Sequence, residues 1–206
     1  MVRVLRAGPG ALLLECPDTA SVQAWHASLF AEREAGQLDA VEIVPAARTV
    51  LLDGVADPAA LAAKLTTRPE PAPVPSGVGP LVQIPTVYDG PDLAEVADLW
   101  DTDVAGVIAI HTSLEFRVAF CGFAPGFAYL TGLPARYHLP RRASPRPSVP
   151  PGTVALAGAF ASVYPVRSPA GWQLLGRTEV RLFDLAAEPS APLVPGTRVR
   201  FRRCGP

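Results

Sequence analysis

A proline-rich segment at residues 68–80 limits what this chain can fold into more than any other feature. It reads RPEPAPVPSGVGP, with five prolines and two glycines in 13 residues. Proline fixes the backbone angle φ and removes an amide donor, so this segment cannot form a helix or a central strand. We therefore expect a linker at 68–80 between two domains, residues 1–67 and residues 81–206. The chain has 206 residues and is 49% hydrophobic, which is enough for two cores.

The first expected domain alternates short apolar strands with amphipathic helices. The first helix can be capped by Asp18, Thr19 or Ser21, because the oxygen of any of these side chains can accept from the first turn. The pair Asp57-Pro58 marks the start of the second helix, because proline tolerates the first helical position. The expected elements are strands at 2–5 and 11–16, a helix from 19 to about 35, strands at 40–46 and 48–54, and a helix at 58–65. The order ββαββα predicts a small split α/β sandwich.

The second expected domain begins with a strand and two helices and then becomes rich in strands. Pro85 interrupts the first strand, at 81–88, and so predicts an edge position for it. Two helices are expected next: one at 91–100 with an apolar face at Leu93, Val96, Ala97 and Trp100, and one at 103–111 that Asp103 caps. The expected strands that follow are at 115–120, 153–157, 162–166, 172–175, 179–183 and 198–202. Many short strands separated by glycine and proline predict an antiparallel barrel or sandwich with long functional loops. The fold class is therefore α+β.

Charge is distributed unevenly along the second domain. Residues 81–140 carry seven acidic and two basic side chains, whereas residues 141–206 carry ten arginines and three acidic side chains. Three of those arginines fall in the stretch LPRRASPRPSVPPG at 139–152, whose five prolines make its backbone stiff. Guanidinium groups held on a stiff loop favour recognition of a carboxylate or phosphate. The alternative for each arginine is a surface ion pair with the acidic region.

Several classes of protein are excluded or disfavoured by the composition. The longest aliphatic run, at 104–110, is far shorter than the roughly 20 residues of a membrane-spanning helix, and we expect a cytoplasmic protein that binds no membrane. Three widely spaced cysteines predict reduced structural thiols, with Cys121 as the alternative catalytic candidate if it were not buried between phenylalanines. Aromatic residues are not interleaved with the basic ones, so no nucleic-acid partner is expected.

Three loops of the second domain carry the candidate chemistry. They read GFAPGFAYLTGLP at 122–134, the proline–arginine stretch at 139–152, and VYPVRSPAGWQLLGRT at 163–178. Residues 168–171 of the third loop are expected to form a turn between two strands. Glycine in the first loop permits a positive φ and a close approach of the backbone, and its aromatic residues either line a pocket or fill a core. His111, expected between a helix and a strand, is the best candidate for a general base, the alternative being a histidine stabilised by the helix dipole.

These three loops, together with PGTRVRF at 195–201, resemble the family of 5-oxoprolinase B subunits over residues 110–201. That family is also labelled allophanate hydrolase subunit 1 and includes an inhibitor of a sporulation histidine kinase. The resemblance implies a cyclophilin-like barrel after a small α/β domain. It also implies two partners, the C-like and A-like subunits of the same enzyme, and ATP-dependent opening of 5-oxoproline to glutamate, the small-molecule substrate.

The resemblance also suggests site residues. His111 and Arg146 would be catalytic. The remaining motif positions, which would bind substrate, are Gly126, Phe127, Tyr129, Arg141, Arg142, Tyr164, Ser168, Trp172 and Arg177. No Walker loop, metal site or biotin site is visible in the sequence, so ATP, with Mg²⁺, is expected to bind in the assembled complex.

The sequence departs from the family pattern in two places. Ala159-Phe160-Ala161-Ser162 stands where the family often has Gly-Gly-Gln-Thr-Gly, and Ala170 replaces a glycine before Gly171-Trp172. Loss of the polar Gln-Thr pair weakens the expectation of a substrate contact there. Two other functions remain open: a module that inhibits a histidine kinase, and the carboxyltransferase component of a urea or amide carboxylase.

Overall fold

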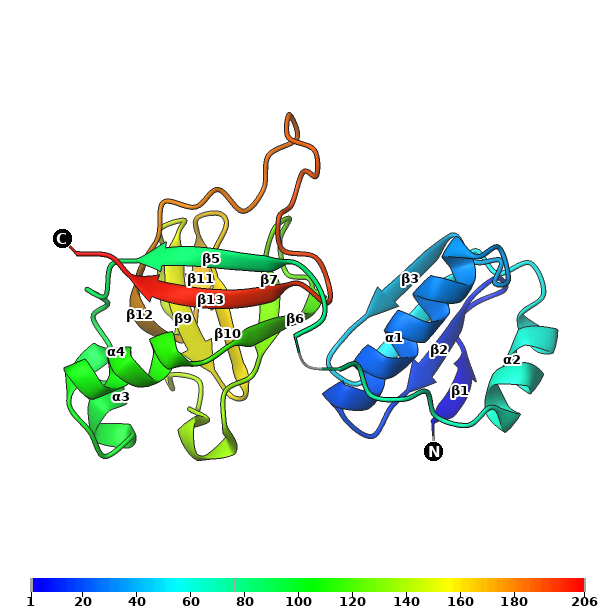
Figure 1. Cartoon of the computed structure of the whole chain (residues 1–206), viewed down its shortest axis with the longest axis horizontal. Coiled ribbons are helices and arrows are strands. Elements are labelled where there is room, and N and C mark those ends of the chain that lie inside the picture. The colour runs from blue at the N-terminus through cyan, green and yellow to red at the C-terminus, as the bar shows by residue number, and fades with distance from the viewer. Residues whose placement is uncertain (1, 76, 206) are drawn as a thin grey trace. The chain divides into compact units, whose positions relative to one another are not determined.

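A computed structural model describes residues 2–75 and 77–205 of the chain. Ser76 of the expected linker and the terminal residues Met1 and Pro206 lie outside the described residues. The chain forms two compact units, Met1–Val78 and Gly79–Pro206 (Figure 1). Each unit is described by itself.

The first unit has the predicted order ββαββα. Its elements are β1 (Arg3–Arg6), β2 (Leu12–Glu15), α1 (Thr19–Glu34), β3 (Glu42–Pro45), β4 (Thr49–Asp53) and α2 (Pro58–Thr67). The four strands form one antiparallel sheet in the order β1-β2-β4-β3. Both helices contribute to a single core with one face of that sheet.

The two helices of the first unit begin at the predicted caps. Asp18 accepts a hydrogen bond from the Ser21 amide at 2.8 Å, and Asp57 accepts one from the Ala60 amide at 3.0 Å. These bonds satisfy amide donors that have no partner inside the first turn of a helix. Trp25 of α1 is fully buried in the core, so capping and burial together fix the position of this helix.

The second unit is a nearly closed, barrel-like sheet with two helices. Its elements are β5 (Leu81–Thr86), α3 (Leu93–Leu99), α4 (Val104–Ser113), β6 (Phe116–Cys121), β7 (Ala128–Thr131), a 3-10 turn (Ala135–Tyr137), β8 (Arg146–Val149), β9 (Thr153–Ala157), β10 (Phe160–Val163), β11 (Ser168–Ala170), β12 (Gln173–Arg177) and β13 (Arg198–Arg203). Seven strands follow the order β12-β9-β10-β7-β6-β13-β5, and a bridge between Val87 and Arg177 joins the two ends. The α+β class predicted from the sequence is confirmed.

One strand pair of the barrel is parallel. β5 and β13 run side by side from the Leu81–Arg198 pair to the Thr86–Arg203 pair (Figure 1). They are the first and last strands of the unit, and the rest of the unit makes the long crossover that a parallel pair requires. β5, interrupted by Pro85, is a terminal strand of the sheet, as predicted.

The helices of the second unit also follow the sequence. Asp103 accepts a hydrogen bond from the Gly106 amide at 2.7 Å and caps α4. The predicted apolar face of α3 is buried, including Val96 at 0% and Trp100 at 8% exposure. Within the described part of the chain, no helix is both long and apolar enough to cross a bilayer.

The second unit differs from the prediction in three places. Strand β7 lies inside the stretch 122–134, which was expected to be a loop. Residues 168–171 were expected to form only a turn, but Ser168–Ala170 pairs as a strand with Arg146–Val149 in a separate two-stranded ribbon. The strand predicted at 179–183 is wrong, because this segment is irregular. The Val180 amide donates to the Thr178 hydroxyl rather than to a neighbouring strand, and the apolar alternation there reflects Leu182 packing into the core.

Candidate functional site

The candidate site lies on an aromatic cluster outside the main barrel core. All five residues of β9 are buried, because Val154 and Leu156 face the barrel core while Ala155 and Ala157 face this second cluster. The cluster also contains Val149 and Ala170 of the β8–β11 ribbon. Because β9 is buried on both faces, the aromatic side chains that pack on it are held in a close-packed, fixed arrangement.

A small pocket of about 110 Å³ opens on this cluster. Its lining combines aromatic rings with one cationic side chain. The lining residues are Phe123, Phe127, Tyr129, Arg141, Tyr164, Pro169, Gly171 and Trp172. The Phe127 ring is central, with centroids 5.0 Å from Tyr129, 5.2 Å from Tyr164 and 5.8 Å from Trp172. Edge-to-face contacts of this kind hold the rings rigidly against one another.

The loop between β6 and β7 delivers two of these rings through unusual backbone angles. Gly126 has φ +81°, and a Cβ there would lie 2.5 Å from the Leu182 carbonyl oxygen, so only glycine fits. Phe123 has φ 72°, which is uncommon for a bulky residue, and its side chain is 60% exposed beside the pocket. Strained, exposed aromatic residues of this kind concentrate at binding sites.

Asp92 fixes the proline–arginine loop to the rest of the barrel. This carboxylate is only 3% exposed. Its Oδ1 accepts from Arg142 at 3.0 Å and from Arg146 at 2.6 Å, and its Oδ2 accepts from the Leu174 amide at 2.7 Å. One buried side chain thus connects the start of α3, the loop and strand β12.

Arg142 makes further contacts that hold the same loop. Its guanidinium also donates to Glu95 at 2.7 Å and to Gln173 at 3.2 Å, and its backbone amide donates to the Gly171 carbonyl at 2.8 Å. The hydrogen bond to Glu95 and the charge of Asp92 raise the pKa of Arg142 above its usual value. These contacts place the neighbouring Arg141 at the pocket.

The four predicted binding arginines therefore have two different environments. Arg142 and Arg146 pair with Asp92, and Arg177 pairs with Asp89, so these three form ion pairs with the acidic region 81–140. Arg141 is exposed and lines the pocket, and the described part of the chain provides it with no ion pair. Arg141 is consequently the guanidinium that is available to a ligand.

Tyr164 also lines this pocket. It is 2% exposed, and its burial raises the pKa of its phenol to about 12, against an opposing effect of the Arg141 charge. The phenol therefore keeps its proton at neutral pH and can donate a hydrogen bond to a ligand oxygen.

His111 does not belong to this pocket. Helix α4 continues to Ser113, so His111 lies in its last turn rather than at a junction with the following strand. It is fully buried, its Nδ1 is 2.7 Å from the Tyr88 hydroxyl, and its ring is 4.4 Å from that of Phe201. Burial lowers the pKa of His111 to about 3, so the imidazole is neutral in the folded protein. Its position away from the pocket disfavours a general base in contact with substrate, and a neutral imidazole gains no charge stabilisation from the helix dipole either.

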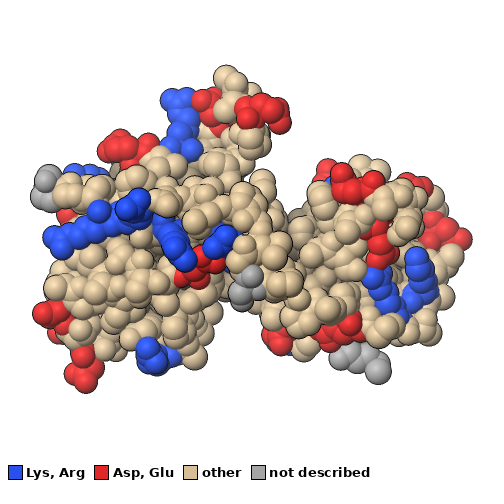
Figure 2. All heavy atoms as spheres, viewed as in Figure 1, with Lys and Arg blue, Asp and Glu red and all other residues tan. Residues whose placement is uncertain are grey.

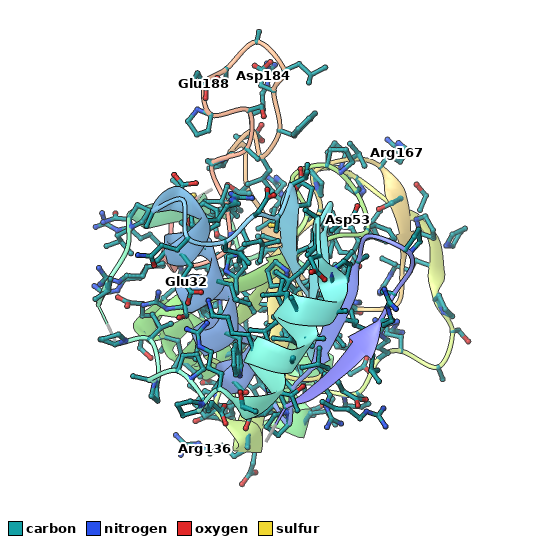
Figure 3. All side chains as sticks on the ribbon, turned by 90° about the vertical axis from the view of Figure 1, so that its right-hand side faces the viewer. Glu32, Asp53, Arg136, Arg167, Asp184 and Glu188 are labelled. Carbon is teal, nitrogen blue, oxygen red and sulfur yellow. The ribbon has the colours of Figure 1, made fainter. Side chains whose placement is uncertain are left out.

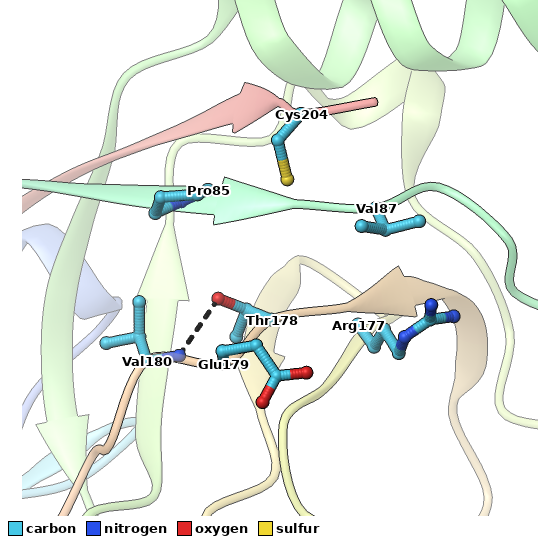
Figure 4. Close-up of a pocket in the computed structure, with 7 residues that line it drawn as sticks. All are labelled: Pro85, Val87, Arg177, Thr178, Glu179, Val180 and Cys204. Carbon is cyan, nitrogen blue, oxygen red and sulfur yellow. Dashed lines mark hydrogen bonds between the residues drawn. The ribbon is translucent and has the colours of Figure 1, made fainter. Parts of the chain in front are cut away.

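A second pocket, of about 320 Å³, lies at the seam where the barrel closes (Figure 4). Pro85 and Val87 line one side of it, Thr178 and Val180 the other, and the Cys204 side chain points toward the space between them. Arg177 lies here and not at the aromatic pocket, so the structure separates it from the other predicted binding residues.

Five of the predicted site residues are brought together in one pocket: Phe127, Tyr129, Arg141, Tyr164 and Trp172. Gly126 does not line the pocket but packs closely against the Leu182 carbonyl. Ser168 lies in β11, and its hydroxyl donates to the Val166 carbonyl. Sequence reasoning missed Phe123 as a pocket residue and Asp92 as the carboxylate that holds the loop. Phe123 falls inside the quoted glycine–aromatic loop, whereas nothing in the sequence pairs Asp92 with arginines about 50 positions away.

The positions that depart from the family pattern do not line the pocket. Ser162 of β10 is fully buried and donates to the Ala128 carbonyl at 2.8 Å. Ala170 is 3% exposed and packs in the aromatic cluster. Cys121, predicted to be buried, is exposed, although its thiol donates to the Leu193 carbonyl and packing around it raises its pKa to about 11. Among the described residues, no group of three or more His, Cys, Asp or Glu side chains is arranged to hold a metal.

The chain matches the family described as carboxyltransferase domain, subdomain C and D, over residues 2–193, and it belongs to that family. The names of its relatives indicate a narrower group within that family. The chain is 34% identical to the 5-oxoprolinase B subunit of Haemophilus influenzae, and the match covers 97% of each protein. It is 47% identical over 123 residues to the 5-oxoprolinase B subunit of Escherichia coli. The resemblance seen in the sequence is confirmed.

The shared length differs among these relatives. The match covers 58% of this chain and 56% of the Escherichia coli protein, so it spans about half the length of that relative.

Solved structures support the fold. The crystal structure of TTHA0988 matches 95% of this chain and 40% of that protein, with 33% sequence identity and a TM-score of 0.77. The K. lactis urea amidolyase matches 99% of this chain and 15% of that enzyme, with 20% identity and a TM-score of 0.73. The second likeness shows that the two chains share a fold.

Proposed function

We propose that this chain is the B subunit of an ATP-dependent 5-oxoprolinase, in which partner subunits complete the enzyme. Its relatives in Haemophilus influenzae and Escherichia coli carry that name, and the first of these matches along nearly its whole length. In this reaction water is added across the lactam C–N bond of 5-oxoproline and gives glutamate, at the expense of ATP.

The pocket beside Arg141 is the observation that carries this proposal. 5-Oxoproline is a compact five-membered lactam with one carboxylate, and the pocket is small, about 110 Å³, and lined by aromatic rings. The Arg141 guanidinium binds the carboxylate through paired hydrogen bonds, and the ring packs against Phe127 and Trp172. The Tyr164 hydroxyl donates to the lactam carbonyl. The chain thus binds and orients the substrate.

ATP does not fit this pocket. Sites for drug-sized ligands occupy about 300–1,000 Å³, well above the volume here. We assign ATP and Mg²⁺ to the assembled complex and the lactam to this pocket. A chain that holds only the lactam is expected to be inactive alone.

A second candidate function is supported by the family match itself. The family is described as a carboxyltransferase domain, which favours a component of a biotin-dependent urea or amide carboxylase. Urea has no carboxylate, so it could not form the paired hydrogen bonds that the Arg141 guanidinium can make. This difference makes the substrate carboxylate the feature that separates the two functions.

The test uses the complex of this chain with the A-like and C-like subunits of its source. We expect ATP hydrolysis that depends on 5-oxoproline and is not stimulated by urea or by 2-pyrrolidinone, which has the same ring without the carboxylate. Arg167, an exposed arginine that donates to Ser148, provides a control: Arg167→Ala should retain the activity that Arg141→Ala loses. Stimulation by urea, or equal stimulation by 2-pyrrolidinone, would contradict the proposal.

A further inference from the structure

Strand β13 presents a row of arginines on the outside of the barrel. Its residues alternate: Val199 and Phe201 are buried in the core, whereas Arg198, Arg200 and Arg202 point to the opposite face of the sheet. Figure 2 shows basic side chains gathered in a line along the second unit. We call Arg198, Arg200 and Arg202 the arginine face.

The arginine face is only partly neutralised by the contacts around it. Glu115 accepts from Arg198 at 2.7 and 2.8 Å and lies 3.0 Å from Arg200. Arg202 donates to the neutral Gln83. Glu115 is thus shared by Arg198 and Arg200, and the side chains of Arg200 and Arg202 remain exposed. Arg117 of strand β6 is directly opposite Arg198 in the register, and like charges opposite one another in a sheet are destabilising.

The adjoining strand does not supply the missing negative charge. On β5 the exposed residues include Leu81, Gln83 and Pro85, none of which is acidic. Pro85 also removes one amide from this terminal strand, which disfavours extension of the sheet by another strand. The arginine face is therefore suited to contact with the side chains of a partner rather than with its backbone. Neutral and apolar residues of β5 lie beside its arginines.

We infer that the arginine face is the docking surface for an acidic face of a partner subunit. Residues two apart on a strand lie about 6.8 Å apart along the backbone, so their guanidinium groups form a row that carboxylates on a protein surface can meet. Arginine is enriched at protein interfaces, and complementary charge fixes the register of the two partners. Nucleic acid is the less favourable occupant, because no aromatic side chain alternates with these arginines on the outer face of the strand for stacking. The inference rests on the proposed function in one respect, that a partner subunit exists.

The experiment measures association between the full chain and the C-like subunit of its source, by calorimetric titration at 50 mM and 300 mM salt. The test variant is Arg200→Gln combined with Arg202→Gln, since neither residue lines the aromatic pocket. The control variant, Arg136→Gln combined with Arg167→Gln, removes the same charge from two side chains that point outward elsewhere (Figure 3). Urea denaturation verifies that both variants are folded.

We expect the test variant to bind at least about tenfold more weakly at 50 mM salt and to lose most of the salt dependence seen with the native chain. The control variant should bind within about twofold of the native chain. Equal binding by both variants would overturn the inference while leaving the proposed function intact. Failure of the native chain to bind the C-like subunit would contradict both. Binding of duplex DNA or anionic vesicles that is tighter than binding of that partner would assign the arginine face to that anion instead.

Discussion

Asp92 and Arg146 form an ion pair with a 2.6 Å hydrogen bond, although they are 54 residues apart in the sequence. The same carboxylate also binds Arg142 and the Leu174 amide, so one buried side chain joins a helix start, the proline–arginine loop and a barrel strand. This arrangement explains why only one arginine of the loop, Arg141, is directed to the aromatic pocket. The first prediction concerns Asp92 itself.

Replacing Asp92 by asparagine should lower both stability and activity. The two guanidinium groups of Arg142 and Arg146 lose the negative charge of the carboxylate that they share. We therefore expect the free energy of unfolding to fall by about 1–3 kcal/mol in urea denaturation. The KM of the assembled complex for 5-oxoproline should rise as Arg141 loses its fixed position. Glu95→Gln is the matched control, because Glu95 contacts Arg142 from a side chain that is 50% exposed and should matter much less. Equal effects of the two substitutions would contradict this account of the loop.

Arg141 should affect ligand binding without affecting the fold. We expect Arg141→Ala to raise the KM for 5-oxoproline by about 10- to 100-fold, the range for loss of charge-assisted hydrogen bonds. Arg141→Lys should recover only part of that loss, since an ammonium group cannot make the paired contact. Steady-state kinetics of the complex, with urea midpoints of the isolated chain, provide the measurement. A urea midpoint that falls as much as that of Asp92→Asn would show that Arg141 is structural.

Phe123 should show opposite effects on stability and binding. Its backbone has φ 72°, and this left-handed region costs a residue with a side chain about 1 kcal/mol or more relative to glycine. Because the ring is 60% exposed, Phe123→Gly should leave the free energy of unfolding unchanged or raise it, while ligand binding weakens. Phe123→Ala keeps the strain and loses the ring, so it should weaken binding without the gain in stability. A large loss of stability in Phe123→Gly would show that the ring is a core residue.

The buried imidazole of His111 should make stability depend on pH. Burial lowers its pKa from the ordinary value of 6.5 to about 3, so between these values the unfolded chain binds more protons than the folded one. Stability should therefore decrease as the pH falls from 6.5 toward 3. His111→Phe should flatten this dependence in urea titrations performed across that range. If activity of the complex at neutral pH survives His111→Phe, the catalytic role suggested by the sequence is wrong.

Much of the architecture was predictable from local patterns. The ββαββα order, the caps at Asp18, Asp57 and Asp103, and the terminal strand with Pro85 all follow from periodicity, capping chemistry and the missing amide of proline. These signals act over a few residues, so a sequence displays them directly. The false strand at 179–183 shows the limit of such patterns, because apolar alternation reports which side chains are buried and does not report whether the backbone has a pairing partner.

The sequence by itself determined the stiffness of the proline–arginine loop and the concentration of glycine and aromatic residues at 122–134. Only the tertiary structure decided how those parts are used. It paired Arg142 and Arg146 with Asp92 and Arg177 with Asp89, left Arg141 open, and buried His111 beside Tyr88. The physical reason is that the state of a charged side chain depends on the distance to its partners and on its exposure to water. Both are set by contacts between residues far apart in the chain.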